Sequence, residues 1–135
     1  MERAITVLSD VNALSELLDG ARVDRARLVP SAGKLRLELE VTRACPELQT
    51  VERRGLMRRR RIPWVTSRLR LDQVKDAAVQ RLDGLPPGQT PLLSCEAIPG
   101  GYRFVVTTAD GLRLQAVLET LSGQFTDTGA PSASP

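Results

Sequence analysis

The sequence predicts a mostly β, α+β domain in which a short N-terminal helix packs on an antiparallel sheet of about six strands. Three observations predict this fold class. Apolar and polar residues alternate along several segments, which is typical of strands with one buried face. Turn sequences rich in Gly and Pro separate these segments. Only one segment, near the start of the chain, has clear helical spacing, and the length of 135 residues suits one domain.

The helical segment is expected to start behind a cap at Ser9 or Asp10 and to end near Leu18, with Gly20 just beyond it. Its apolar residues recur at the spacing of one helical face: Val11, Leu14, Leu17 and Leu18. A helix this short is not stable alone, so we expect it to pack on the sheet.

The clearest strand signal runs from Lys34 to Thr42, where leucine and valine alternate with charged or polar residues. Residues 23–29 form its predicted partner strand, and residues 30–33 have the composition of a tight turn between the two. The apolar phase shifts after Val23, which predicts a β-bulge.

The middle of the chain gives a weaker signal. Residues 44–63 show no sustained period and contain two prolines and a glycine, so they are predicted to form a long, exposed, arginine-rich loop. Alternation resumes from Trp64 to Leu71. Residues 72–82 fit either a helix or an irregular strand, and the sequence leaves both open.

The C-terminal part is predicted to contain three strands joined by short connections, at Leu92–Ile98, Tyr102–Thr108 and Leu112–Leu118. Leu121 and Phe125 are expected to complete the core of a single domain spanning residues 1–127. Residues 128–135 are small, rich in Pro and Ser, and predicted to form a flexible tail.

Several segments carry a resemblance to known proteins: residues 10–23, the strand end Val41-Thr42-Arg43, residues 67–74, Pro91-Leu92-Leu93 and residues 112–127. In these segments the chain resembles a family of small uncharacterised bacterial proteins, mainly from alphaproteobacteria. The resemblance implies a β-rich fold with residues 72–82 as a strand. It implies no particular activity.

The residue types argue against most enzyme chemistries. The sequence has no histidine, which excludes Ser-His-Asp and Cys-His catalysis and histidine-ligated metals, and it has no glycine-rich phosphate loop. Glu38 and Glu40 share a strand face and could hold a divalent cation, although a solvated face is the simpler interpretation. Other carboxylates, such as Asp127, fit caps and turns. We therefore expect no catalytic residues, no metal and no cofactor.

Cysteine content and the first residues bear on the compartment. Cys45 and Cys95 are too few for a disulfide framework, so they are expected to be reduced thiols of a cytoplasmic protein. Residues 1–20 carry five charged side chains, which is unlike a signal peptide. No stretch approaches the roughly 18 apolar residues that span a bilayer, so no membrane partner is expected.

The one unusual feature is a cluster of arginines. Residues 43–70 carry nine basic and two acidic side chains, for a net charge of +7. A polyanion would explain this crowding, and a following aromatic ring could stack on a base. The candidate binding residues are Arg53, Arg54, Arg58, Arg59, Arg60, Arg61 and Trp64.

These observations predict a non-catalytic binding or interaction module. One alternative is sequence-nonspecific nucleic-acid binding through Arg53–Arg61. A second is a metal-dependent enzyme that uses Glu38 and Glu40. An acidic protein partner and a solvated, arginine-rich hairpin tip both remain open as readings of the cluster, and so does the oligomeric state, a homodimer included.

Overall fold

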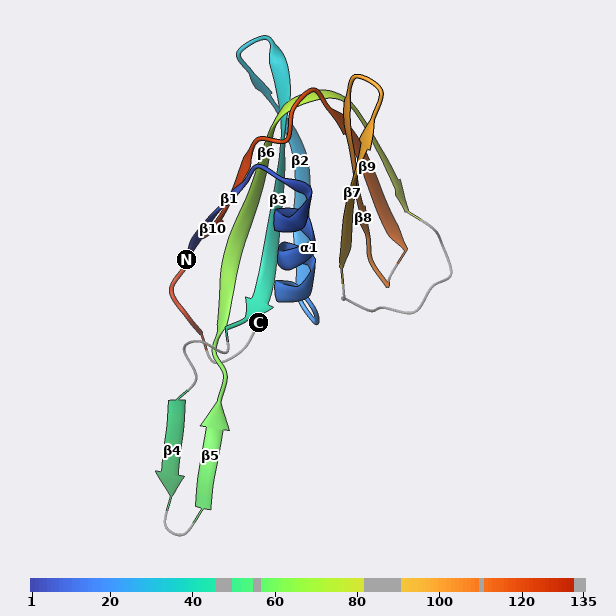
Figure 1. Ribbon diagram of the computed structural model, residues 1–135. Coiled ribbons are helices and arrows are strands. Elements are labelled where there is room, and N and C mark those ends of the chain that lie inside the picture. The colour runs from blue at the N-terminus through green and yellow to red at the C-terminus, as the bar shows by residue number, and fades with distance from the viewer. Residues whose placement is uncertain (46–49, 55–56, 82–90, 110, 133–135) are drawn as a thin grey trace.

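One helix and ten strands make up the part of the chain that the computed structural model describes, residues 1–45, 50–54, 57–81, 91–109 and 111–132 (Figure 1). Side chains are described for the same residues except 50–54, 57–61 and 79–81. In chain order the elements are β1 Glu2–Ile5, α1 Leu8–Leu17, β2 Arg22–Ser31, β3 Lys34–Ala44, β4 Thr50–Arg54, β5 Met57–Arg61, β6 Trp64–Arg81, β7 Leu92–Ile98, β8 Gly101–Thr107, β9 Leu112–Leu118 and β10 Gly123–Asp127.

The long strand β6 organises the main sheet. Along its first half it pairs with β3 on one edge and with β10 on the other, and along its second half it pairs with β9. The sheet runs β1-β10-β6-β9-β8-β7 and is extended from β6 through β3 to β2, with all pairs antiparallel. Figure 1 shows β6 arching over so that the two halves of the sheet lie on either side of α1. The predicted fold class, a short helix on a curled antiparallel sheet, is confirmed.

The arch of β6 also answers the question left open for residues 72–82, because β6 continues as a strand to Arg81. Gln73 has a φ of 61°, and the register with β9 shifts between Val74 and Asp76. A bulge moves the inward phase by one residue, so Val74 and Ala77 both reach the core. The helix-like spacing in the sequence is therefore the mark of a bulged strand.

The core lies between the two halves of the sheet and the helix. The inward faces predicted from alternation are buried in β3, in the first half of β6 and in the strands β8 and β9. The predicted bulge after Val23 is confirmed, and Leu121 and Phe125 are buried as expected. Where β10 crosses β6 the backbones approach closely, and a Cβ on Gly123 would lie 2.4 Å from the Arg70 carbonyl oxygen.

The helix begins two residues earlier than Asp10, at Leu8. Asp10 acts from within the first turn, where its Oδ2 accepts hydrogen bonds from the Thr6 and Val7 backbone N–H groups at 3.0 and 3.1 Å. These two bonds hold the pKa of Asp10 below its usual value. Asp10 therefore caps the helix, as predicted, but it does so from position N3, whereas the N-cap residue is Val7.

The prediction of a long loop over residues 44–63 was wrong for residues 50–54 and 57–61, which form the two paired strands of a hairpin, β4 and β5. β4 ends in two arginines and β5 is one methionine followed by four arginines, so neither segment shows a sustained alternation of apolar and polar residues. Within the predicted C-terminal tail, two described residues are bonded to the first residues of β6. Ser132 and Trp64 exchange two backbone hydrogen bonds of 2.7 and 2.8 Å, and Thr128 N–H donates to the Thr66 carbonyl oxygen. Residues 133–135 lie outside the described part.

Among the described residues, no helix has both the length and the apolar character needed to cross a membrane.

Candidate functional site

The six candidate arginines all lie in the β4–β5 hairpin, which is a two-stranded sheet separate from the main one. The register sets Arg53 opposite Arg58 and Glu52 opposite Arg59. Within residues 50–61 the sequence has six arginines and one acidic residue, Glu52. In Figure 1 the hairpin extends away from the main sheet, beyond the ends of β3 and β6. The contacts of its side chains lie outside what the structure describes.

The base of the hairpin is held by the main sheet. The Cys45 N–H donates to the Pro63 carbonyl oxygen at 2.8 Å, and Ala44 pairs with Trp64. Trp64 is the first residue of β6, is partly buried, and is bonded through its backbone to Ser132. The candidate aromatic residue therefore stands at the junction between hairpin and sheet rather than along the hairpin itself.

Directly beneath this junction lies a buried charge. Arg43 is 0% exposed and is the largest fully buried side chain described. Its Nη2 lies 3.2 Å from both carboxylate oxygens of Asp127, and its Nη1 donates to the Ala44 carbonyl oxygen at 3.3 Å. Ser67 Oγ donates to Asp127 Oδ1 at 2.7 Å, and the guanidinium sits 6.0 Å from the centre of the Phe125 ring.

The surroundings of Asp127 act on its ionisation in opposite directions. Burial raises the pKa of Asp127, whereas the hydrogen bonds from Ser67 and the N-terminal ammonium, together with Arg43, lower it. The lowering contributions win, so the pKa of Asp127 lies below its usual value and the carboxylate is charged at neutral pH. The expectation that Asp127 serves a cap or turn was wrong, since it ends β10 and pairs with a buried cation.

The outer face of the sheet holds the two glutamates considered for a metal. Glu38 is 7% exposed, and its Oε2 lies 2.7 Å from an Arg27 nitrogen of the neighbouring strand β2. Glu40 Oε1 lies 3.4 Å from Arg68 Nη2 of β6. Among the described side chains no group of three or more His, Cys, Asp or Glu could hold a metal ion. Each glutamate thus faces a guanidinium, and the geometry favours charge pairing over metal binding.

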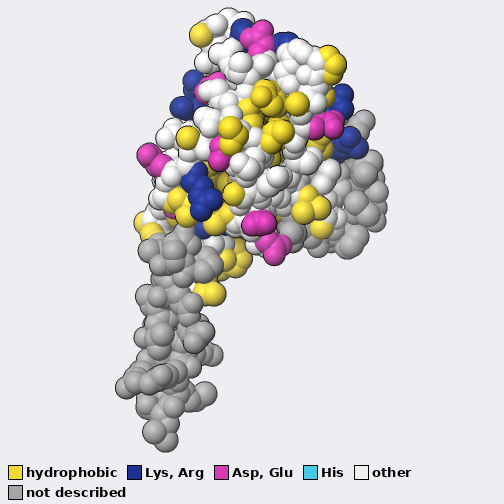
Figure 2. Space-filling view, in the orientation of Figure 1, with side chains coloured by type: hydrophobic (Ala, Val, Ile, Leu, Met, Phe, Trp, Pro, Cys, Tyr) yellow, Lys and Arg dark blue, Asp and Glu magenta, His cyan; other side chains and the backbone are white. Residues whose placement is uncertain are grey.

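A groove of about 330 Å³ crosses the same outer face. Three arginines and two glutamates line it, together with Gln124 and Thr126. Glu40 and Asp72 beside it pair with those arginines. The outer face is therefore close to charge balance, unlike the hairpin with its six arginines and one glutamate. On the face of the molecule seen in Figure 2, too, the basic and acidic side chains of the described residues are interspersed.

The two cysteines are reduced thiols, Cys45 buried and Cys95 half-buried. Burial, and secondarily the charge of Glu96, raises the pKa of Cys95 above its ordinary value. A raised pKa keeps the thiol protonated at neutral pH and disfavours a nucleophilic role for Cys95.

Sequence reasoning found the arginine cluster and missed the Arg43–Asp127 pair. Position 43 has the phase of the inward-facing residues of β3, which places a charged side chain where an apolar one is expected. That break in the pattern was the available signal. Comparisons of the chain with known protein families, curated proteins and solved structures found no match.

Proposed function

We propose that the protein is a non-catalytic binding module that holds the sugar-phosphate backbone of nucleic acid on the β4–β5 hairpin. The observation that carries this proposal is the composition and place of the hairpin. Six arginines and one glutamate occupy a two-stranded sheet that shares no ladder with the eight described strands of the main sheet. The non-catalytic part rests on the sequence, which contains no histidine and no phosphate-binding glycine loop.

Folding alone gives no reason to gather these charges. A two-stranded hairpin is marginally stable in water, and guanidinium groups brought together on ten residues repel one another. A polyanion reverses both effects, because each phosphate neutralises a cation and releases condensed counterions. Arginine suits this role through its planar fork of donors, which binds two phosphate oxygens at once.

The main sheet supports the proposal as a scaffold. The hairpin leaves the sheet at Ala44 and returns at Trp64, and the buried Arg43–Asp127 pair lies directly below. A fixed base limits the conformational freedom that the hairpin loses on binding, which favours affinity. Trp64, partly exposed at the junction, is placed to contact the part of a ligand that approaches the sheet.

The test is fluorescence anisotropy with a labelled single-stranded oligonucleotide of mixed sequence, titrated from about 50 mM to about 300 mM KCl. We expect binding at the lowest salt and a log–log salt slope of about −3 to −4, which corresponds to about four to six phosphate contacts. Replacing Arg58, Arg59, Arg60 and Arg61 together with serine should abolish binding at every salt concentration.

A matched variant controls for net charge. R3S/R22S/R25S/R113S removes four exposed arginines from the main sheet and should keep most of the affinity. Equal losses in the two variants would show a general charge effect and overturn the proposal. No binding at about 50 mM KCl would overturn it too. Tighter binding of polyglutamate than of the oligonucleotide would reassign the hairpin to an acidic protein partner.

A further inference from the structure

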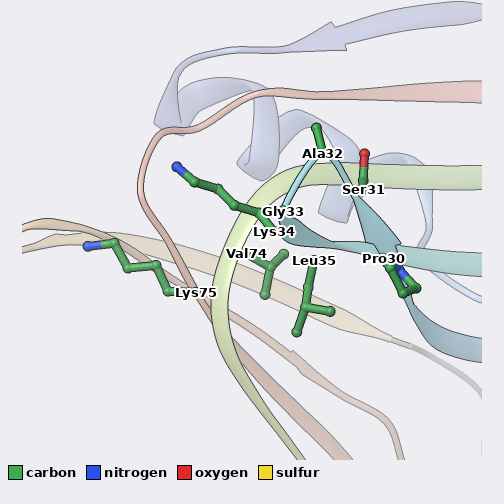
Figure 3. Close-up of a pocket in the computed structure, with 8 residues that line it drawn as sticks. All are labelled: Pro30, Ser31, Ala32, Gly33, Lys34, Leu35, Val74 and Lys75. Atoms are coloured by element: carbon green, nitrogen blue, oxygen red, sulfur yellow. The ribbon is translucent and has the colours of Figure 1, made fainter.

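A pocket of about 620 Å³ opens beside the turn between β2 and β3, at the start of β3 and near the arch of β6. Its walls are the turn between β2 and β3, residues 30–35, and Val74 and Lys75 of β6 (Figure 3). Sites for small molecules typically measure about 300–1,000 Å³, so the pocket has the size of a ligand site.

The lining combines an apolar floor with two cations. Leu35 and Val74 are partners across the β3–β6 ladder, and Pro30 adds a third apolar side chain. In Figure 3 the side chains of Lys34 and Lys75 both extend toward the same side of the view. These are the two lysines of a chain whose other 17 basic residues are arginines. The chain thus places both of its lysines at one pocket.

Neither ammonium group is held by a buried carboxylate among the described residues. Lys75 Nζ donates to the Gly100 carbonyl oxygen at 2.9 Å, which leaves its charge without a described carboxylate in contact. Lys34 pairs with Glu119, and the two side chains are 40% and 39% exposed. Exposed pairs of this kind contribute little, so a ligand carboxylate can take the place of Glu119.

Beyond the pocket, one edge of β6 pairs with no described strand. Pairing with β3 stops at Val74, and no described strand replaces β3 on this edge from Lys75 onward. The Ala77 N–H donates instead to the Asp76 carboxylate at 2.9 Å. An open strand edge leaves peptide N–H groups that need an acceptor, and at Ala77 that acceptor is already a carboxylate.

From these observations we propose that the pocket binds a small monocarboxylate with an apolar tail. The carboxylate lies between the two ammonium groups, and the tail covers Leu35 and Val74. Charge fixes the orientation of the ligand, and burial of the tail supplies the remaining affinity. This site is independent of the hairpin and of its partner.

The test follows amide signals by ¹H–¹⁵N NMR while octanoate is added to the full chain. We expect the largest shifts at Lys34, Leu35, Val74 and Lys75, with a dissociation constant of millimolar order for a ligand of this size. Octylammonium carries the same tail with the opposite charge and should bind at least about tenfold more weakly, as loss of two exposed ion pairs implies.

Substitutions of the two lysines then test whether their charges bind the carboxylate. K34Q/K75Q should weaken octanoate binding about tenfold, K34R/K75R should retain it, and R25Q/R113Q, which removes two exposed arginines elsewhere, should leave it unchanged. Equal affinity for octanoate and octylammonium would overturn the proposal, because it would show apolar contact without charge selection. Shifts absent from the pocket residues would overturn it as well. The comparison of the two ligands and the location of the amide shifts are both measured on the unmodified chain, so neither depends on whether the variants fold.

Discussion

The main sheet and the β4–β5 hairpin differ in the acidic residues that accompany their arginines. At least seven arginines of the main sheet lie within 4 Å of a carboxylate of a described residue: Arg22, Arg27, Arg36, Arg43, Arg68, Arg70 and Arg103. The hairpin has six arginines and one glutamate. A composition biased toward arginine therefore yields paired cations where the fold holds them, and the crowding in the hairpin calls for a different explanation.

Within the main sheet the pairs form a series in burial. Arg43 and Asp127 meet on the core side, Arg27 and Glu38 are partly buried on the outer face, and Arg68 and Glu40 are loosely joined at 3.4 Å. Breaking a buried pair leaves a charge without its partner, whereas an exposed pair is worth little. The loss in free energy of unfolding on substitution should therefore decrease in the same order, and it should be smallest for the hairpin.

The largest effect is expected at Arg43. Arg43→Met keeps much of the side-chain volume but leaves the Asp127 carboxylate without its buried cation, so the free energy of unfolding should fall by about 3 kcal/mol. Urea unfolding followed by circular dichroism measures the loss. Arg25→Met, at an exposed position of β2, is the control and should change stability by less than about 0.5 kcal/mol. Similar values for the two variants would show that burial of Arg43 does not set its importance.

A second effect appears on acidification. Because the pKa of Asp127 is lowered in the folded protein, its stabilising contribution is complete above the unfolded value near 3.8 and is lost as pH falls through the folded pKa. Urea midpoints measured from neutral to strongly acidic pH should therefore drop less steeply for Asp127→Asn than for the unmodified protein. Asp10, whose pKa is also lowered, accounts for part of the remaining slope. Identical slopes with and without the Asp127 carboxylate would contradict this expectation.

The two glutamates of the outer face should differ from each other. Glu38→Gln removes the charge from a pair joined at 2.7 Å beneath neighbouring side chains and should cost about 1–2 kcal/mol. Glu40→Gln loosens a pair that is already long and should cost less than about 0.5 kcal/mol. Both values come from the same urea titration. A larger loss at Glu40 would reverse the burial order. Stabilisation of the unmodified protein by added Mg²⁺ that is absent from both variants would revive a metal site.

The alternation of apolar and polar residues within single strands predicted much of the main sheet. Contacts between residues far apart in the sequence could not be predicted in this way. The period-2 alternation of β3 and of the strands after Leu92 reports which face is buried, so those elements followed directly. The partners Arg43 and Asp127 are 84 residues apart and meet only because β6 lies between β3 and β10. No local spacing carries that information. The two strands of the hairpin, which was kept open only as one reading of the arginine cluster, were not predicted for another reason: their sequences have no apolar–polar period to detect.

The smallest effect on stability is expected at the hairpin, and it gives the comparison its sharpest form. Replacing Arg58–Arg61 with serine removes four cations from a segment with one acidic residue, so the free energy of unfolding should stay within about 0.5 kcal/mol or rise slightly. R27S/R36S/R68S removes three paired arginines from the main sheet and should cost more, although it deletes fewer charges. If the hairpin variant instead lost 1 kcal/mol or more, about the worth of partly buried pairs, its arginines would be bound to carboxylates of the same chain. They would then be unavailable to a polyanion. A neutral result combined with lost oligonucleotide binding would separate the two uses of arginine in one molecule.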